Sequence, residues 1–375
     1  MTRWRRPRLR VTSDAEQERH ASWIELFFDL VFVIVVATLS NTLKVNLSFV
    51  GFLEFAALFV PCWWTWVLVT FYADRYDVDD VIHRLLILSG MLAVIFLAAN
   101  IHNAFGAGAI GFTLSYVVVR SIVLMLYMRA ARHVDVAWAN FKLYLTSYVP
   151  STSLWLVSII TPQPIRYVFW AVAMVIELLT PILGSRAFAK TPVHPSHLPE
   201  RFGLLTLIVL GEEVVSVATA TSSTNWNLIT TFAAVEGFAI AACLWWLYFN
   251  FQETSIVIRD IRSVHIYNYG HLPIIMGLTL VAVGIQQTIY EASHRFLWVG
   301  TRWALCGGVA LYMSSIGVIW VAGCRRRLSG LLIGAVALAL SLAIAGGSLP
   351  PLAILSILLA MLMCKVSIDI FRLKN

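Results

Sequence analysis

The stretch WIELFFDLVFVIVVATL, from Trp23 to Leu39, decides the class of fold. Its side chains are apolar enough for a membrane, but Glu25 and Asp29 interrupt it four residues apart. Four residues make about one helical turn, so both carboxylates lie on one face of the predicted helix. An acid at the centre of a membrane helix costs roughly 2.5–3.5 kcal/mol on insertion scales. The stretch therefore predicts a membrane helix with two acids that need a physical explanation.

The whole chain has the composition of a membrane protein. Of its 375 residues, 59% are hydrophobic and 13% are charged, and the mean hydropathy is +0.81. A soluble fold of this composition would expose apolar patches far larger than soluble monomers tolerate. We therefore exclude a soluble fold and predict an all-α, polytopic integral protein of the cell (plasma or inner) membrane.

Apolar runs of about twenty residues, the length that crosses a bilayer, recur along the chain. They predict about twelve transmembrane helices, near residues 23–43, 50–72, 84–104, 108–131, 140–161, 166–185, 200–222, 226–251, 268–290, 298–322, 329–346 and 350–371. The remaining segments are a basic arm at 1–22, a linker at 186–199 and a tail at 372–375. The linker separates a first group of six helices, 23–185, from a second group, 200–371.

The distribution of lysine and arginine predicts that both termini are cytoplasmic. Cytoplasmic loops are enriched in these residues, and in this orientation the opposite side holds only Lys44, Arg166, Arg295 and Arg302. The arm begins MTRWRRPRLR and suits anionic lipid headgroups. We interpret the net charge of +7 as a topology signal and expect no nucleic-acid partner.

The two groups of six helices resemble each other. EFAALFVPCWWTW, from Glu54 to Trp66, aligns without a gap on EGFAIAACLWWLY, from Glu236 to Tyr248. An acid and a Trp-Trp pair match in this alignment. We infer two tandem six-helix repeats, an arrangement that in transporters commonly surrounds a binding site near the membrane midplane.

Charged side chains inside the predicted helices are the candidates for an ion or substrate pathway. They are Glu25, Asp29, Glu54, Arg120, Glu177, Glu212, Glu213 and Glu236. The deep acids outnumber the single guanidinium of Arg120, a surplus that a bilayer does not tolerate freely. Protonation, a bound cation or a water-filled cavity would each resolve it. Alternatively, the acids hold helices together through hydrogen bonds to Ser, Thr, Trp and Arg120.

The segment YADRYDVDDVIHR, from Tyr72 to Arg84, concentrates charge after the second predicted helix. One interpretation is a cytoplasmic mouth that attracts cations, lined by Asp74, Arg75, Asp77, Asp79, Asp80 and His83. A second is general acid catalysis, because Asp77 to Asp80 spell D-x-D-D and resemble the acid motif of class II terpene cyclases. A third is a solvated turn whose acids pair with Arg75 and Arg84. Further along, His194 and His197 stand among prolines, which predict an extended connector rather than a metal site.

Three stretches resemble the bacterial low-temperature-requirement A (LtrA) family: WIELFFDLVFV, WWTWVLVTFYADRYDVDD and HLPERFGLLTLIVLGEE. The last carries the most specific motif, formed by Glu200, Arg201, Phe202, Gly203 and Gly211. The resemblance covers nearly the whole chain and implies an integral membrane protein linked to growth in the cold. It implies no particular reaction or transported species. Glu213 replaces a more usual small residue, which leaves open whether Glu212 or Glu213 is functional.

These observations favour a channel or a proton- or cation-coupled transporter that uses its intramembrane carboxylates. The alternative is an intramembrane enzyme acting on an isoprenoid or other lipid, with Asp79 as general acid between Asp77 and Asp80. A third hypothesis is a membrane-adaptation factor without turnover. We expect no cofactor and no bound metal. The expected partners are the lipid bilayer and a small cation, a proton or a lipid-like substrate; a homo-oligomer is compatible with the sequence.

Overall fold

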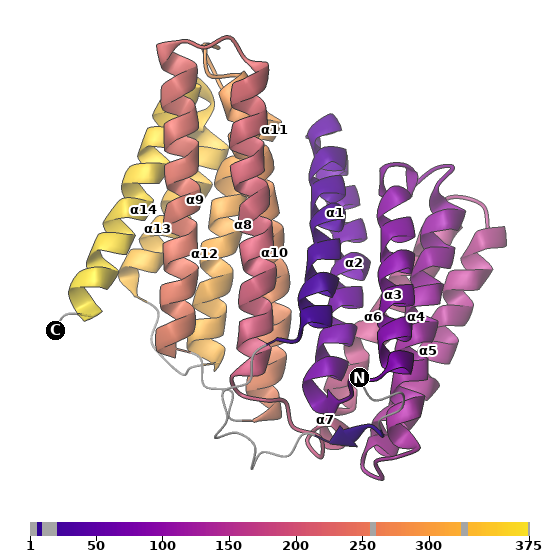
Figure 1. Cartoon of the computed structure of the whole chain (residues 1–375). Helices are drawn as coiled ribbons and strands as arrows, with labels where there is room; N and C mark the ends of the chain where they lie inside the picture. Colours follow the sequence, from indigo (N-terminus) through magenta and orange to yellow (C-terminus); the bar gives the residue numbers. More distant parts are fainter. Residues whose placement is uncertain (1–5, 10–20, 256–259, 324–328, 374–375) are drawn as a thin grey trace. The chain divides into compact units, whose positions relative to one another are not determined.

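A computed structural model describes residues 6–9, 21–255, 260–323 and 329–373 of the chain (Figure 1). In these residues, twelve helices are long and apolar enough to cross a membrane. Helices are favoured there because lipid offers no hydrogen bonds, so each N–H and C=O must find a partner within its own segment. The predicted all-α, polytopic membrane architecture is confirmed.

The chain divides into two compact units. Unit 1 consists of Met1–Thr38, Ala57–Phe202 and Ile258–His265, and unit 2 consists of Leu39–Ala56, Gly203–Val257 and Ile266–Asn375. Four long helices contribute residues to both units: α1 (Trp23–Val45), α2 (Phe49–Arg75), α8 (His197–Ser223) and α10 (Ile261–Tyr290). The predicted tandem repeat of residues 23–185 and 200–371 stays a prediction.

Unit 1 contains a run of helices that are neighbours in both sequence and space. In chain order these are α3 (Val81–Ala99), the short η2 (Ile101–Asn103), α4 (Ala109–Ala131), α5 (Ala137–Ile160), α6 (Ile165–Leu183) and α7 (Ser185–Phe188). Helix α3 packs on α4, α4 on α5 and α5 on α6. A two-residue strand from the arm, β1 (Arg8–Leu9), pairs antiparallel with β2 (Tyr76–Asp77). Residues 1–5 and 10–20 of the predicted arm lie outside the described residues.

Unit 2 contains the helices of the second half of the chain. They are α9 (Leu228–Ser255), α11 (Val299–Arg302), α12 (Gly308–Val318), α13 (Gly330–Ala345) and α14 (Pro351–Leu373), with the π-helical turns η3 (Trp303–Gly307) and η4 (Ile319–Gly323) and the short η5 (Gly346–Ser348). Helix α9 packs on α14, and α12 packs on α13. The predicted span 298–322 is therefore one membrane crossing with a wider turn inside it, η3, and a second at its end, η4.

Two segments that the sequence predicts to lie between helices are partly helical. Helix α2 continues to Arg75, so Asp74 lies on a helix and not in a loop. The predicted linker 186–199 ends in the first turn of α8, which begins at His197. Pro199 does not prevent this, because the first turn of a helix has no internal partner for its backbone N–H groups. The predicted connector therefore includes His194, but His197 lies in the first turn of α8.

Glycines allow α10 to approach the segment from η3 to α12 within unit 2. A Cβ atom on Gly277 would lie 2.9 Å from the carbonyl oxygen of Gly308, and one on Gly284 would lie 2.4 Å from the backbone N of Leu305. Membrane helices associate by close packing of small residues, because lipid removes the hydrophobic driving force between them. These glycines thus set the separation of the two backbones.

We predict that Gly284→Val lowers the melting temperature of the detergent-purified protein, because overpacking costs typically 1–3 kcal/mol. Gly334→Val is the matched control: it makes the same change in α13, where a Cβ atom meets nothing within 4 Å. The measurement is thermal unfolding followed by tryptophan fluorescence. Equal melting temperatures for the two variants would contradict the packing assigned to α10.

Candidate functional site

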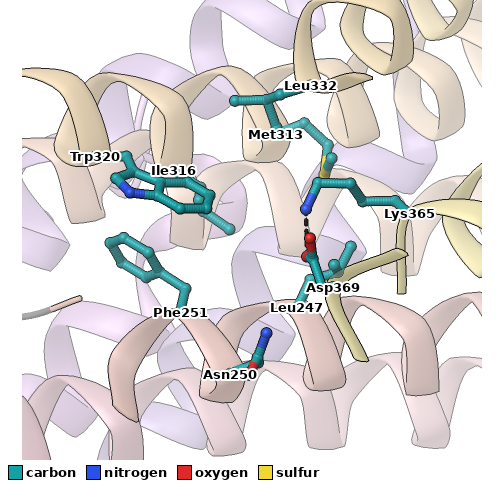
Figure 2. Close-up of a pocket in the computed structure, with 9 residues that line it drawn as sticks. All are labelled: Leu247, Asn250, Phe251, Met313, Ile316, Trp320, Leu332, Lys365 and Asp369. Atoms are coloured by element: carbon teal, nitrogen blue, oxygen red, sulfur yellow. Dashed lines mark hydrogen bonds and ion pairs between the residues drawn. The ribbon is translucent and has the colours of Figure 1, made fainter. Parts of the chain in front are cut away.

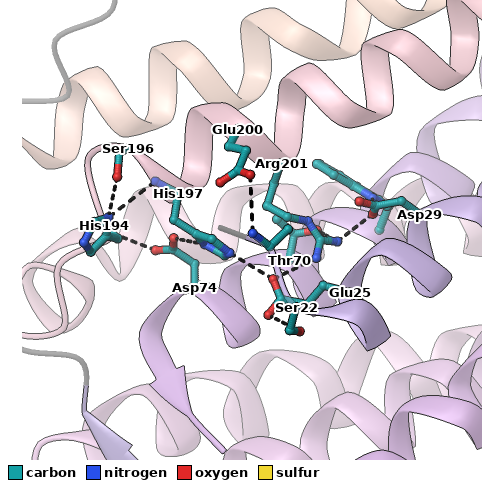
Figure 3. A network of polar contacts seen from close by, with 12 residues as sticks. Ser22, Glu25, Asp29, Thr70, Asp74, His194, Ser196, His197, Glu200 and Arg201 are labelled. Carbon is teal, nitrogen blue, oxygen red and sulfur yellow. Dashed lines mark hydrogen bonds and ion pairs between the residues drawn. The ribbon is translucent and has the colours of Figure 1, made fainter. Parts of the chain in front are cut away.

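Arg201 lies between the two carboxylates of α1 that interrupt the first apolar stretch (Figure 3). Its Nη1 donates to Glu25 Oε2 at 2.9 Å, and its Nη2 donates to Asp29 Oδ1 at 2.6 Å. Because Glu25 and Asp29 are one helical turn apart, the fixed fork of a single guanidinium reaches both. Arg201 comes from α8, so this contact joins two helices that are far apart in sequence.

His197 lies one turn before Arg201 on α8 and also contacts two carboxylates. Its Nδ1 is 2.8 Å from Asp74 Oδ1, and its Nε2 is 3.0 Å from Glu25 Oε2. The ring is fully buried. The four-residue spacing places His197 and Arg201 on the same face of α8. Glu25 therefore receives both the imidazole and the guanidinium on one oxygen.

Neighbouring donors fix the three carboxylates in place. Trp66 of α2 donates its indole N–H to Asp29 Oδ1 at 2.8 Å. The backbone N–H of His194 donates to Asp74 Oδ2 at 2.8 Å, and Ser22 Oγ donates to Glu25 Oε1 at 2.8 Å. Hydrogen bonds from fixed donors orient the carboxylates and reduce the cost of burying them.

We refer to Glu25, Asp29, Asp74, His197 and Arg201 as the Arg201 cluster. Its three carboxylates face one guanidinium and one imidazole, all within unit 1. With a neutral imidazole and ionised carboxylates the cluster carries a net charge of −2, and one bound proton reduces it to −1. Net charge is expensive inside a membrane protein, so the cluster favours proton uptake.

A second buried ion pair in unit 1 joins Arg120 of α4 to Glu177 of α6. The Arg120 Nη2 and Glu177 Oε2 atoms are 2.6 Å apart, and both side chains are buried. Tyr116 Oη donates to Glu177 at 2.6 Å and Ser151 Oγ donates at 3.0 Å. The Arg120 guanidinium also lies over the Tyr148 ring, 3.7 Å from its centroid. The pair is neutral, and the donors around the Glu177 carboxylate suit a structural role.

The D-x-D-D segment is split between exposed and buried positions. Asp79 is exposed, and its two oxygens accept from Arg84 at 2.6 and 2.8 Å. Asp77 is also exposed, on β2. Asp80 is buried, caps α3 by accepting from the backbone N–H of His83 at 2.9 Å, and pairs with Arg129. Exposure of Asp79 does not fit the burial that the general-acid interpretation requires.

The other residues of the predicted cytoplasmic mouth are also buried. Asp74 belongs to the Arg201 cluster, and the His83 ring stacks near Tyr72, 6.0 Å between centroids. Arg75 donates to the backbone oxygen of Thr191 at 3.1 Å and lies over the Phe188 ring. Burial raises the pKa of the nearby Tyr76 hydroxyl, which accepts from Asn140 at 3.2 Å. The solvated-turn interpretation therefore fits the exposed Asp79, which pairs with Arg84. It does not fit the buried Asp74, Arg75 and His83.

The candidate acids of unit 2 do not form a comparable cluster among the described residues. Glu212 lies 3.8 Å from Lys44, and Glu236 accepts from Ser356 Oγ at 2.6 Å. Glu54 is half-buried, and Glu213 is fully buried. Lys365 and Asp369 form a separate ion pair beside a small cavity lined by Trp320 and Asn250 (Figure 2).

The positive half of the Arg201 cluster, His197 and Arg201, is not predicted from the sequence. The lysine and arginine distribution predicts Arg201 on the cytoplasmic side and the prolines predict His197 in a connector, which leaves Arg120 as the single buried guanidinium. That expectation is wrong, because Arg75 and Arg201 are also buried. The available signal was the spacing of four from His197 to Arg201, which matches the spacing of four from Glu25 to Asp29.

Comparison with known proteins identifies the same family that the sequence motifs resemble. The family model for "Bacterial low temperature requirement A protein (LtrA)" matches residues 20–367, a range that includes every member of the cluster. The chain belongs to the LtrA family. This LtrA protein is also 27% identical over 319 residues to an uncharacterised protein of Rhizobium meliloti (strain 1021), covering 80% of this chain and 76% of the relative. No solved structure matches the chain.

The LtrA motif residues occupy different environments in the structure. Arg201 forms the cluster, Glu200 accepts from the backbone N–H of Ala21 at 3.4 Å, and Phe202 packs edge-on against Trp66 at 4.9 Å between centroids. Gly203 is buried. Gly211 is exposed, and a Cβ atom there would meet nothing within 4 Å. The motif thus contributes Arg201 to the cluster. Its Phe202 packs against Trp66, which donates to Asp29.

We predict that Arg201→Gln destabilises the LtrA protein by about 3–5 kcal/mol, because it leaves two buried carboxylates without their counter-charge. Adding Asp29→Asn should restore part of the lost stability, since it removes one of the two uncompensated carboxylate charges. The measurement is thermal unfolding in detergent. Arg84→Gln is the control, since it breaks an exposed pair with Asp79 and should leave the melting temperature unchanged. Equal melting temperatures for Arg201→Gln and Arg84→Gln would refute the assignment.

Proposed function

We propose that this LtrA protein is a proton-coupled transporter of the cell membrane and that the Arg201 cluster is its proton-binding site. The observation that supports this most strongly is the position of His197 between two carboxylates. Both ring nitrogens lie within hydrogen-bond distance of a carboxylate oxygen, at 2.8 and 3.0 Å. Each of these contacts needs a hydrogen on the line that joins the two atoms.

Proton counting on these two contacts gives an exchangeable proton. A neutral imidazole carries one N–H, and its other nitrogen is an acceptor that repels a carboxylate oxygen. The arrangement is satisfied when the ring is an imidazolium, or when Asp74 or Glu25 carries the second hydrogen. In either case the cluster holds one proton more than it does with ionised carboxylates and a neutral ring. This proton lies between α1, α2 and α8. Histidine is the side chain best suited to exchange such a proton near neutral pH.

Asp29 offers a further place for a proton in the same cluster. Its Oδ1 accepts from Arg201 and from Trp66, while its buried Oδ2 has no hydrogen-bond partner among the described residues. A proton on Oδ2 would neutralise Asp29 without breaking either contact on Oδ1. The cluster therefore has two neighbouring positions for protons, joined through the guanidinium of Arg201 and the carboxylate of Glu25.

The contacts of the cluster favour a proton over a metal cation. Arg201 and His197 already lie against the oxygens of Glu25, Asp29 and Asp74 that a metal ion would have to coordinate. Hard cations such as calcium take six to eight oxygen ligands. A proton needs one oxygen or one nitrogen, and it can be accepted without displacing the guanidinium.

The alternative as a lipid-acting cyclase has less support. A general acid must be held in its neutral form beside its substrate, whereas the ion pair with Arg84 stabilises the Asp79 carboxylate. The third hypothesis, an adaptation factor without turnover, makes no use of a proton held in the membrane. We also propose that the cytoplasmic arm contacts anionic headgroups, because Arg6 and Arg8 are exposed beside β2.

We predict that liposomes containing the purified protein show proton flux, and that His197→Asn reduces its rate at least tenfold. A pH-sensitive dye inside the liposomes would report the flux under an imposed potential, with and without small metabolites extracted from the host. Asp74→Asn should have the same effect, because it removes the other end of the same contact.

His133→Asn is the matched control, because His133 is an exposed histidine of the same unit and should leave the flux unchanged. Equal flux in the wild type and in His197→Asn would reject the proposed site. Absence of flux in wild-type liposomes under all these conditions would support the adaptation factor instead.

A further inference from the structure

Glu213 in α8 is a buried acid of unit 2 without the partners that other buried charges have. Its side chain is fully buried, and neither carboxylate oxygen has a hydrogen-bond partner among the described residues. It is the seventeenth residue of α8, about 24 Å along the helix axis from His197. Glu213 therefore lies at membrane depth and away from both helix ends.

The other buried charged side chains in the described part of unit 2 each have an ion-pair or hydrogen-bond partner. Lys365 pairs with Asp369 and lies 5.9 Å from the centroid of the Trp320 ring (Figure 2). Arg302 donates to the backbone oxygen of Ala343 at 2.9 Å. Glu212, the neighbour of Glu213, lies 3.8 Å from Lys44. Because adjacent residues of a helix point about 100° apart, the cation beside Glu212 is not placed to serve Glu213.

The polar groups around Glu213 do not neutralise it. Tyr312 of α12 is close enough to interact electrostatically with Glu213, but its hydroxyl donates to the backbone oxygen of Leu244 at 2.7 Å. Ser216 lies one turn further along α8, and its buried hydroxyl also has no partner among the described residues. Residues three apart share a face of the helix, so Glu213 and Ser216 form a small polar patch in apolar surroundings.

An ionised carboxylate in such a place lacks both water and a counter-charge. Groups in this position avoid the cost by becoming neutral, and a carboxylate becomes neutral by binding one proton. We propose that Glu213 is a second proton-carrying site of this protein, located in unit 2 and independent of the Arg201 cluster. The carboxylate takes up one proton to become the acid and returns it to water when unit 2 admits water. This role rests on the proposed function as a proton-coupled transporter.

Three features separate this site from a merely structural acid such as Glu177. Glu177 has a guanidinium at 2.6 Å and two hydroxyl donors, so it is stable as an anion and gains nothing from a proton. Glu213 has none of these among the described residues. The hydroxyl on its own helix face, that of Ser216, has no hydrogen-bond partner among the described residues either.

Infrared spectroscopy tests the proposal directly, because the C=O stretch of a neutral carboxylic acid is distinct from the bands of a carboxylate. We expect the wild-type protein in phosphatidylcholine liposomes at pH 7 to show this acid band, and to show a shift of the band after transfer to D₂O. In Glu213→Gln the acid band should weaken by the intensity of one carboxyl group. The control Glu54→Gln changes a half-buried acid of the same unit and should keep it.

Glu213→Asp keeps a carboxyl group and should shift the frequency of the band, which assigns it even if Glu213→Gln does not fold. A band unchanged by both substitutions, or no band at pH 7, would overturn the proposal. So would a band that never shifts in D₂O, because the acid would then be sealed and structural. Removal of the band by sodium chloride but not by choline chloride would identify a metal-cation site instead of a proton site.

The spectrum needs no transport activity, so the two proposals fail in different ways. Liposomes without proton flux but with an exchangeable Glu213 band would count against transport and leave the proton site standing. Flux that depends on His197 in a protein without the Glu213 band would count against this inference alone.

Discussion

The contact of the Arg201 guanidinium with Glu25 and Asp29 allows α1, the first membrane helix, to carry two acids within the membrane protein. Glu25 and Asp29 would make α1 a poor membrane segment on its own, because each carries charge into a medium that does not solvate it. Arg201 supplies the counter-charge from α8, and Trp66 supplies a further donor from α2. These three helices therefore depend on one another electrostatically, in addition to their packing. Removing one partner leaves a buried charge uncompensated, which is more costly than removing the whole pair.

The orientation of His197 is fixed by the same cluster, through its contacts with Asp74 and Glu25. Helix α8 starts at His197, and its first turn brings the imidazole and the guanidinium to the same side. Glu25 Oε2 lies against both of them, at 3.0 and 2.9 Å. A change in the protonation of His197 therefore changes the electrostatic interaction of Arg201 with α1. Through this shared oxygen, a proton bound at one end of the cluster affects the contact that joins α1 to α8.

The sequence predicts the number and approximate positions of the membrane helices because length and hydropathy determine them. It predicts the two acids of α1 as the feature to explain, from their spacing alone. It does not predict their partners, since contacts between residues about 170 positions apart leave no local pattern. Helix ends are predicted less well: the sequence predicts that the second helix ends near residue 72, although α2 continues to Arg75. Burial of that last turn by Thr191, His194 and Phe188 outweighs the local polarity.

In the proposed proton site, each of the two nitrogen-to-oxygen contacts of His197 contains a hydrogen. The most direct measurement is NMR of the protein in lipid with ring-¹⁵N-labelled histidine, using His197→Asn to assign the signals. We expect a hydrogen-bonded proton on both ring nitrogens, or on one ring nitrogen and on the carboxyl that faces the other, with one proton lost as the pH rises. A ring nitrogen that faces its carboxylate without a hydrogen at every pH would contradict the account.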